Sequence, residues 1–242
     1  MELASLRNCF LFLLALASSP ELVAQDSAAT KSPWAKTTKA LVAPSLLFVA
    51  GAYSNQYKYR IEDQRNKDQP NFHCSLDNYS QFEPIALAYG LNWGGIKGKN
   101  DLANRTALLL KSELLMTILV QSLKYSTHVL RPDGSNDHSF PSGHTAEAFA
   151  AATFLHKEYG HISIWYSIGG YTTASAVGAL RILNNKHWVS DVLVGAGIGI
   201  LSVNLVYLTH QYRWGKNNKG SQVFLSPTYG TGPGIYFCYR FK

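Results

Sequence analysis

The sequence has 242 residues, enough for one domain with a sizeable core, and no Pro/Ser/Gly-rich linker divides it. Lysine and arginine number 22 against 15 acidic residues, and the resulting formal charge of +7 fits an anionic partner. The cations are scattered along the chain without a long run of like charge, so we expect no nucleic-acid partner.

The N-terminus predicts an export signal. Arg7 precedes an apolar stretch from Cys9 to Ala17, and small residues as far as Ala24 offer cleavage points. The stretch is too short to cross about 30 Å of hydrocarbon as an uncleaved anchor. We therefore expect residues 1–24 to be a signal peptide and residues 25–242 to form a single domain.

Export would leave two cysteines in the mature chain, Cys74 and Cys238. They either pair in an oxidising compartment or stay free. Neither lies in a CxxC or histidine-rich stretch, so no metal cluster is expected around them.

Hydrophobic stretches predict an all-α fold, a helical bundle. An early apolar run, residues 38–53, is broken by Pro44, and residues 54–75 are polar and typical of surface structure. Four later stretches rich in Ala, Leu and Ile are long enough for helices. They are Arg105 to Leu130, Thr145 to Phe154, Ile162 to Leu180 and Trp188 to Leu208.

The bundle is expected to be membrane-associated. Residues 162–180 and 188–208 are near the length and apolarity of a spanning helix, whereas Lys111 and Glu113 interrupt the stretch before them. A soluble helical core is the alternative, because hydropathy alone does not separate the two. Residues 235–241 then alternate with period two behind a glycine-rich turn, which predicts a short C-terminal β-hairpin, packed either on the bundle or at a lipid interface.

The first of three polar motifs contains Lys124 and Arg131. They are seven residues apart, or two helical turns, so both side chains would lie on one face of a helix that runs to Pro132. Two solvated cations at a helix C-terminus are the alternative.

The second motif is PSGHT, from Pro141 to Thr145, at the expected start of a helix. Ser142 would cap that helix, the amide of Gly143 would point at an anion, and His144 would stand beside it. A capping serine followed by a structural histidine is the alternative.

The third motif is RILNNKHWVSD. Arg181 ends one helix, and His187 and Asp191, four residues apart, begin the next. The carboxylate would then accept a hydrogen bond from one imidazole nitrogen and leave the other free as a nucleophile; a surface ion pair is the alternative. If the helices alternate in direction, all three motifs meet at one end of the bundle.

Together the motifs resemble those of the type 2 phosphatidic acid phosphatase and vanadium haloperoxidase superfamily. The segments KYSTHVLRP, PSGH and RILNNKHWVSD, between Lys124 and Asp191, have that family's spacing. One position departs: Leu180 stands where the family has a serine before Arg181, which removes a hydroxyl contact worth about 1 kcal/mol.

The resemblance implies that His187 attacks phosphorus to form a phosphohistidine, that Asp191 orients it, and that His144 protonates the leaving alcohol and then activates water. It implies no metal and no other cofactor. The phosphate-binding residues it implies are Lys124, Arg131, Ser142, Gly143 and Arg181.

The short link between the first two motifs, residues 133–140, resembles membrane-type lipid phosphatases. With the signal peptide, this implies an enzyme exported to a bacterial periplasm or envelope membrane, with its active site facing the periplasm and a lipid phosphate as substrate. Lipid A is preferred over undecaprenyl pyrophosphate and phosphatidylglycerol phosphate. A soluble periplasmic acid phosphatase, a vanadate-dependent haloperoxidase and a non-catalytic lipid-phosphate binding protein are the alternatives.

Overall fold

The computed structural model describes residues 33–211, 222–229 and 233–240, and it confirms the expected all-α fold. The expected signal peptide lies outside the described residues. The helices are α2 (Pro33–Ser54), the short 3-10 helix η1 (Asn55–Tyr57), α3 (Lys58–Asp68), α4 (Asp77–Ser80), α5 (Glu83–Trp93), α6 (Leu102–Thr127), α7 (Gly143–Tyr159), α8 (Ile164–Leu183) and α9 (Val189–Thr209).

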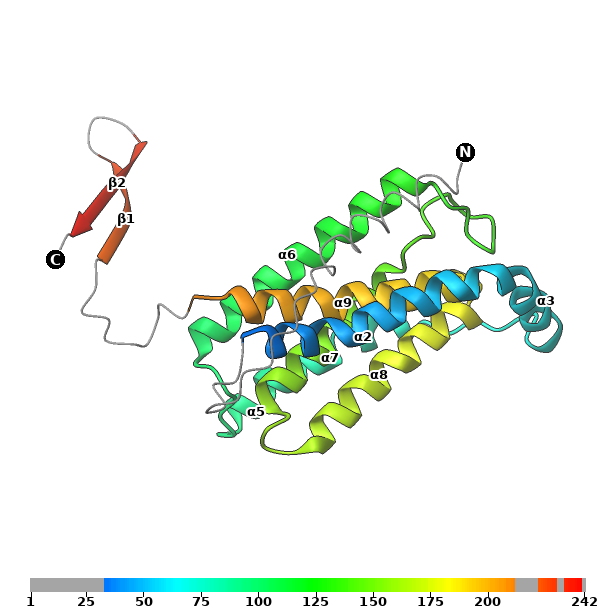
Figure 1. Cartoon of the computed structure of the whole chain (residues 1–242), viewed down its shortest axis with the longest axis horizontal. Coiled ribbons are helices and arrows are strands. Elements are labelled where there is room, and N and C mark those ends of the chain that lie inside the picture. Colours follow the sequence, from blue (N-terminus) through cyan, green and yellow to red (C-terminus); the bar gives the residue numbers. More distant parts are fainter. Residues whose placement is uncertain (1–32, 212–221, 230–232, 241–242) are drawn as a thin grey trace, which may run out of the picture.

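The long helices lie side by side along the molecule (Figure 1). α9 packs against α2, α7 and α6, and α7 also packs against α8 and α5. Figure 1 shows α3 and the loop that follows α6 at one end of the helical bundle, and α5 at the other end of the bundle. The C-terminal ends of α6 and α8 therefore share one end of the bundle with the N-terminal ends of α7 and α9.

Glycines bring α7 and α9 into close contact. A Cβ at Gly195 would lie 2.5 Å from the carbonyl oxygen of Ser142, and one at Gly199 would overlap that of Ala146. Ala146 and Ala150, on the facing side of α7, are fully buried. Only hydrogen at these two α9 positions lets the backbones approach, which places the start of α9 beside the start of α7.

The helix α2 continues through Pro44, where a break was predicted from the sequence. Proline has no N–H, so the carbonyl four residues earlier, that of Ala40, loses its helical donor. The buried side chain of Asn204 on α9 donates to this carbonyl from Nδ2 at 2.8 Å. A neighbouring helix thus supplies the missing hydrogen bond.

All four expected helices are present with shifted ends. The change with most consequence is in α6, which ends at Thr127, three residues before the expected Leu130. It ends there because His128 adopts a left-handed conformation with φ 48° and donates its N–H to the carbonyl of Lys124.

By length and composition, α6 and α9 are long and apolar enough to cross a membrane. From the sequence, a spanning length was expected of the α9 and α8 regions, and not of α6, where Lys111 and Glu113 lie. In the structure 56% of the α9 span is buried inside the bundle and only 28% of the α6 span.

The chain ends in two antiparallel strands, β1 (Gln222–Tyr229) and β2 (Pro233–Arg240), with Gln222 opposite Arg240. β2 covers most of residues 235–241, the stretch that alternates with period two. That these strands contact the bundle or lipid stays a prediction. Cys74 is a free cysteine.

Candidate active site

The predicted site residues lie at one end of the bundle. Lys124 is in the last turn of α6 and Arg181 in the last turn of α8, whereas Ser142 caps α7 and His187 lies two residues before α9. The charges of Arg181 and Lys124 both act on His187, and that of Arg181 also acts on His144. The structure thus brings the three motifs together.

Hydrogen bonds between loops hold this end of the bundle. The N–H of Ser142 donates to the carbonyl of Asp191 at 3.0 Å, which joins the starts of α7 and α9. The N–H of Asp133 donates to the carbonyl of Asn185 at 3.2 Å, and its carboxylate pairs with Lys186 Nζ at 2.6 Å. The loop after α6 is therefore tied to the turn between α8 and α9.

Arg131 lies in that loop, so the expectation that it shares a helix face with Lys124 was wrong. The left-handed turn at His128 ends the helix first. The ammonium of Lys124 instead donates to the carbonyl of His138, in the same loop, at 2.7 Å. The loop, and not a common helix face, keeps the two cations near each other.

His187 and Asp191 are buried, with side chains 2% and 1% exposed. Their closest atoms, Nδ1 and Oδ2, are 3.6 Å apart, which is longer than the hydrogen bond that the sequence suggested. Oδ2 accepts instead from Ser139 Oγ at 2.5 Å and from the N–H of Trp188 at 3.0 Å. Ser139 Oγ also lies 3.5 Å from His187 Nδ1. Asp191 therefore acts on the imidazole through its charge and not through a direct hydrogen bond, and Ser139 lies beside both groups.

Burial lowers the pKa of His187 to about 4, although Asp191 acts in the opposite direction. Desolvation disfavours the imidazolium, and the charges of Arg181 and Lys124 add to this effect. At neutral pH the ring is uncharged and retains the lone pair that a nucleophile needs.

Ser142 caps α7 as predicted. Its Oγ accepts from the N–H of Thr145 at 3.4 Å and lies 2.9 Å from Thr145 Oγ1. The first amides of α7, including that of Gly143, have no carbonyl partner within the helix and so favour an anion at this position.

His144, in the first turn of α7, meets a residue that the motifs do not contain. Its Nε2 lies 2.9 Å from Oδ1 of Asn78, the second residue of the short helix α4. Burial, and then the charge of Arg181, lower the pKa of His144 to about 4. The ring is therefore neutral at pH 7.

A buried ion pair holds Arg181. Its Nη1 lies 2.7 Å from Asp77 Oδ2, and the side chains are 9% and 1% exposed. Asp77 begins α4, which packs on α8 and α7. The Asn184 side chain bonds both the N–H and the carbonyl of Cys74, at 2.9 and 2.7 Å. These bonds hold the segment before α4 against the end of α8.

Arg131 and Arg181 each keep a donor without a partner. Their Nε atoms are buried, and neither has a hydrogen-bond partner among the described residues. After desolvation, the charge of Arg181 is the main cause that lowers the pKa of Arg131, so the two groups are close. Buried unpaired donors are rare, and guanidinium groups match the oxygens of phosphate. The arrangement indicates a site for an oxyanion.

Sequence reasoning missed Asp77, Asn78 and Ser139. Asp77 and Asn78 follow a polar stretch that looked like surface structure, and no local pattern sets them apart. Ser139 lies three residues before the cap at Ser142 and could have been noticed as a hydroxyl within the motif region.

Comparison with known proteins finds relatives of the segment that carries the motifs. Residues 105–215, which contain every motif residue from Lys124 to Asp191, match the PAP2 superfamily. The resemblance drawn from the three motifs is confirmed.

Among individual proteins, a lipid A 1-phosphatase of Porphyromonas gingivalis is 45% identical to this chain over 150 residues, or 61% of the chain. The match spans only 33% of the length of that relative. Two crystal structures are also similar. Aquifex aeolicus LpxE is 26% identical, with a TM-score of 0.46, covering 60% of this chain and 93% of its own. A transmembrane PAP2-type phosphatidylglycerolphosphate phosphatase from Bacillus subtilis is 21% identical, with a TM-score of 0.45, covering 72% and 94%.

Proposed function

We propose that this protein is a phosphatase that removes the 1-phosphate of lipid A through a phosphohistidine intermediate. The observation that supports the reaction most directly is that Arg131 and Arg181 each keep a buried Nε donor without a partner, near a neutral His187. The 45% identity to a lipid A 1-phosphatase supports the choice of substrate.

His187 is the nucleophile in this proposal. Its Nδ1 faces Asp191 and Ser139, so Nε2 is the nitrogen left for phosphorus. The lone pair of Nε2 forms the P–N bond as the P–O bond to the lipid breaks, and the negative charge of Asp191 stabilises the imidazolium that develops.

His144 transfers the protons. The charge of a bound phosphate raises the pKa of the His144 imidazole, which is about 4 without it, so that the ring gives a proton to the leaving oxygen. The neutral ring then takes a proton from water, which attacks the phosphohistidine and releases inorganic phosphate. Each step balances with water as the only co-substrate.

The remaining motif residues stabilise the transferred phosphoryl group. Phosphoryl transfer depends on positioning and positive charge more than on covalent help. Arg131 and Arg181 supply their unpaired donors, the amide of Gly143 and the first turn of α7 supply the helix N-terminus, and Ser142 shapes that turn. Lys124 adds charge while it holds the loop through the His138 carbonyl.

Asp77 and Asn78 act as positioning residues. Asp77 accepts a hydrogen bond from Nη1 of Arg181. This contact fixes the guanidinium so that the edge carrying the unpaired Nε faces the oxyanion. Asn78 holds Nε2 of His144 in the absence of substrate. Two successive residues of one short segment thereby orient a binding group and a catalytic group on two different helices.

A membrane setting fits the surface of the bundle. Large apolar side chains are exposed along one face of α6, at Leu110 (64%), Leu114 (62%) and Ile118 (53%). A similar stripe on α2 includes Leu46 and Val49. Exposed apolar stripes on long helices are typical of contact with lipid. We place the active site on the periplasmic side, because the N-terminal sequence resembles an export signal.

The experiment is a substrate panel with the detergent-solubilised protein. Lipid A, undecaprenyl pyrophosphate, phosphatidylglycerol phosphate and a soluble phosphate ester are compared by kcat/KM. Lipid A should exceed the soluble ester by several powers of ten, since each buried methylene of the acyl chains contributes about 0.8 kcal/mol. Equal rates on lipid A and on the soluble ester would contradict this proposal and identify a soluble acid phosphatase instead.

Inhibition by orthovanadate tests the proposed histidine mechanism. Its five-coordinate form mimics the in-line transition state, so it should inhibit competitively, and chelators should leave turnover intact. Inhibition by chelators without inhibition by vanadate contradicts the histidine mechanism, and vanadate-dependent halide oxidation identifies a haloperoxidase.

A further inference from the structure

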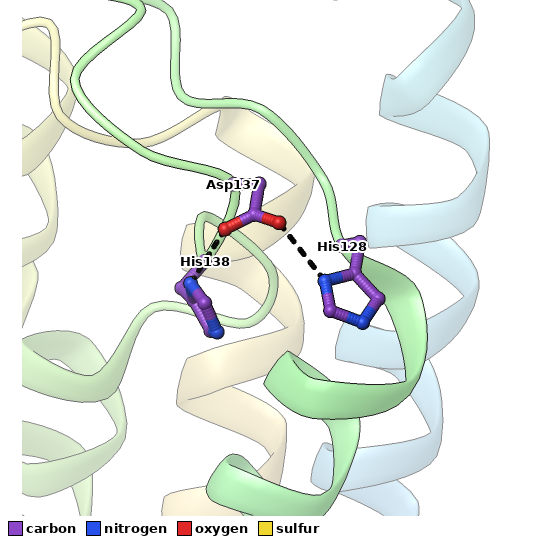
Figure 2. Close-up of side chains that lie close together, drawn as sticks. All are labelled: His128, Asp137 and His138. Carbon is purple, nitrogen blue, oxygen red and sulfur yellow. Dashed lines mark hydrogen bonds and ion pairs between the residues drawn. The ribbon is translucent and has the colours of Figure 1, made fainter.

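A cluster of potential metal ligands lies on the loop between α6 and α7, outside the proposed phosphate site. His128 directly follows α6, and Asp137 and His138 lie near the end of the loop. Figure 2 shows the two imidazole rings on either side of one carboxylate. His128 Nδ1 is 2.9 Å from Asp137 Oδ2, and His138 Nδ1 is 2.7 Å from Asp137 Oδ1.

We propose that His128, Asp137 and His138 bind a divalent transition-metal ion of the zinc class. One ligand atom from each residue lies within 4.8 Å of the others, so small side-chain rotations place all three at metal-bonding distance, about 2.0–2.2 Å for Zn²⁺. Two imidazoles with one carboxylate favour Zn²⁺ over Mg²⁺ or Ca²⁺, which prefer oxygen ligands alone.

The exposure of the cluster fits an ion that keeps a water ligand. The side chains of His128, Asp137 and His138 are 60%, 49% and 36% exposed. Three protein ligands leave a fourth tetrahedral position open to solvent. The ion can therefore enter and leave without unfolding the loop.

The backbone holds the ligands in place. His128 has the left-handed conformation that ends α6, and the N–H of His138 donates to Asn136 Oδ1 at 3.0 Å. The N–H of Ser139 donates to the carbonyl of Val129 at 2.9 Å, which closes the loop next to both histidines. A preorganised loop loses little conformational entropy when an ion binds.

The same loop joins the cluster to the proposed phosphate site. The carbonyl of His138 accepts from Lys124 Nζ at 2.7 Å, and the N–H of Arg131 donates to the carbonyl of Asn136 at 3.0 Å. An ion that draws His128 and His138 together would hold Arg131 and Lys124 in position. This consequence rests on the proposed phosphatase function, whereas ion binding itself does not.

Zn²⁺ alone is the probe for the binding test. Tag-free, full-length protein in detergent is stripped with a chelator, dialysed against buffered Zn²⁺ and analysed for metal content. The wild type should bind about one Zn²⁺ per chain, and His128→Ala and His138→Ala should each weaken binding by more than the ten- to hundredfold typical of losing an outer-shell partner. The matched control is His161→Ala, an exposed histidine at the opposite end of α7, which should bind as the wild type does.

Zn²⁺ content that is unchanged in both variants, or absent from the wild type, overturns the proposal. A thermal unfolding midpoint that rises with Zn²⁺ in the wild type and in His161→Ala, but not in His128→Ala, is a second expected result. The link to the phosphate site is measured separately, as a lower KM for the lipid phosphate with Zn²⁺ bound. Binding without a change in KM refutes only the link, and binding by a catalytically inactive protein leaves the ion site established while the proposed function fails.

Discussion

Replacing Asp77 by asparagine tests how Arg181 is positioned. The substitution keeps the shape and one oxygen acceptor but removes the charge from a pair whose side chains are 1% and 9% exposed. Removing one partner of a buried pair costs about 3–5 kcal/mol, and the neutral hydrogen bond that remains offsets about 1 kcal/mol. We therefore expect the free energy of unfolding to fall by about 2–4 kcal/mol.

The same substitution should also reduce activity. Without the carboxylate, the guanidinium of Arg181 is no longer fixed with its free donor toward the phosphate, and kcat/KM should fall about 10- to 100-fold, or roughly 1.4–2.8 kcal/mol. Lipid-phosphate hydrolysis, the inhibition constant of orthovanadate and denaturant unfolding are measured on one folded preparation in detergent.

The control is Asp63→Asn, the same change in the exposed pair with Lys67, where the atoms are 2.6 Å apart and the side chains are 66% and 64% exposed. It should leave both stability and turnover close to those of the wild type, because exposed ion pairs contribute little to stability. If Asp77→Asn raises kcat/KM or tightens vanadate binding, Asp77 competes with phosphate for Arg181, and the positioning role is refuted.

Four further results are expected. His144→Ala should slow hydrolysis about a hundredfold to ten-thousandfold, and less for esters whose leaving group needs no proton; equal losses contradict the acid role. Because the folded-state pKa values of His187 and His144 are about 4, the unfolded chain binds more protons between pH 6.5 and 4, so the thermal unfolding midpoint should fall as pH drops through this window. A flat midpoint in the wild type contradicts those pKa values. Asn204→Ala should lower the free energy of unfolding by about 1–3 kcal/mol, measured with denaturant, because the buried carbonyl of Ala40 loses its donor. Leu180→Ser should leave vanadate affinity unchanged or tighten it, and a severe loss of activity would show that Leu180 packs in the bundle.

Local signals were enough to predict the helices and where the motifs meet. Ser142 is a capping residue before an apolar run, and the spacing from Lys124 to Asp191 sets the order of helix ends. Since consecutive helices reverse direction, the motifs were expected at one end, and the structure has them there.

Contacts between distant residues could not be predicted in this way. Asp77 and Arg181 are 104 positions apart, and neither the charge nor the neighbours of Asp77 mark it as buried. Asn204 lies 164 positions from Ala40, so the sequence around Pro44 gave no sign that α2 continues.

The prediction that Arg131 shares a helix face with Lys124 was wrong for a local reason. A left-handed residue ends α6 at His128, and histidine is only an occasional choice for that conformation, so the helix was expected to run to the proline. The long i,i+4 distance between His187 and Asp191 has a similar origin. His187 lies before the helix, where helical spacing no longer applies.

The central claim is that His187 accepts phosphate from a lipid, and transfer of label tests it most directly. Lipid A carrying radioactive phosphate at the 1-position is mixed with the detergent-solubilised protein, and the reaction is quenched within one turnover in alkali, where phosphohistidine survives. Label should appear on the wild-type protein and on the exposed-histidine control His161→Gln, map to the peptide that contains His187, and be absent from a folded His187→Gln variant that no longer hydrolyses the lipid. Hydrolysis that persists in His187→Gln, or turnover by the wild type with no label on the protein at any time, would contradict the claim.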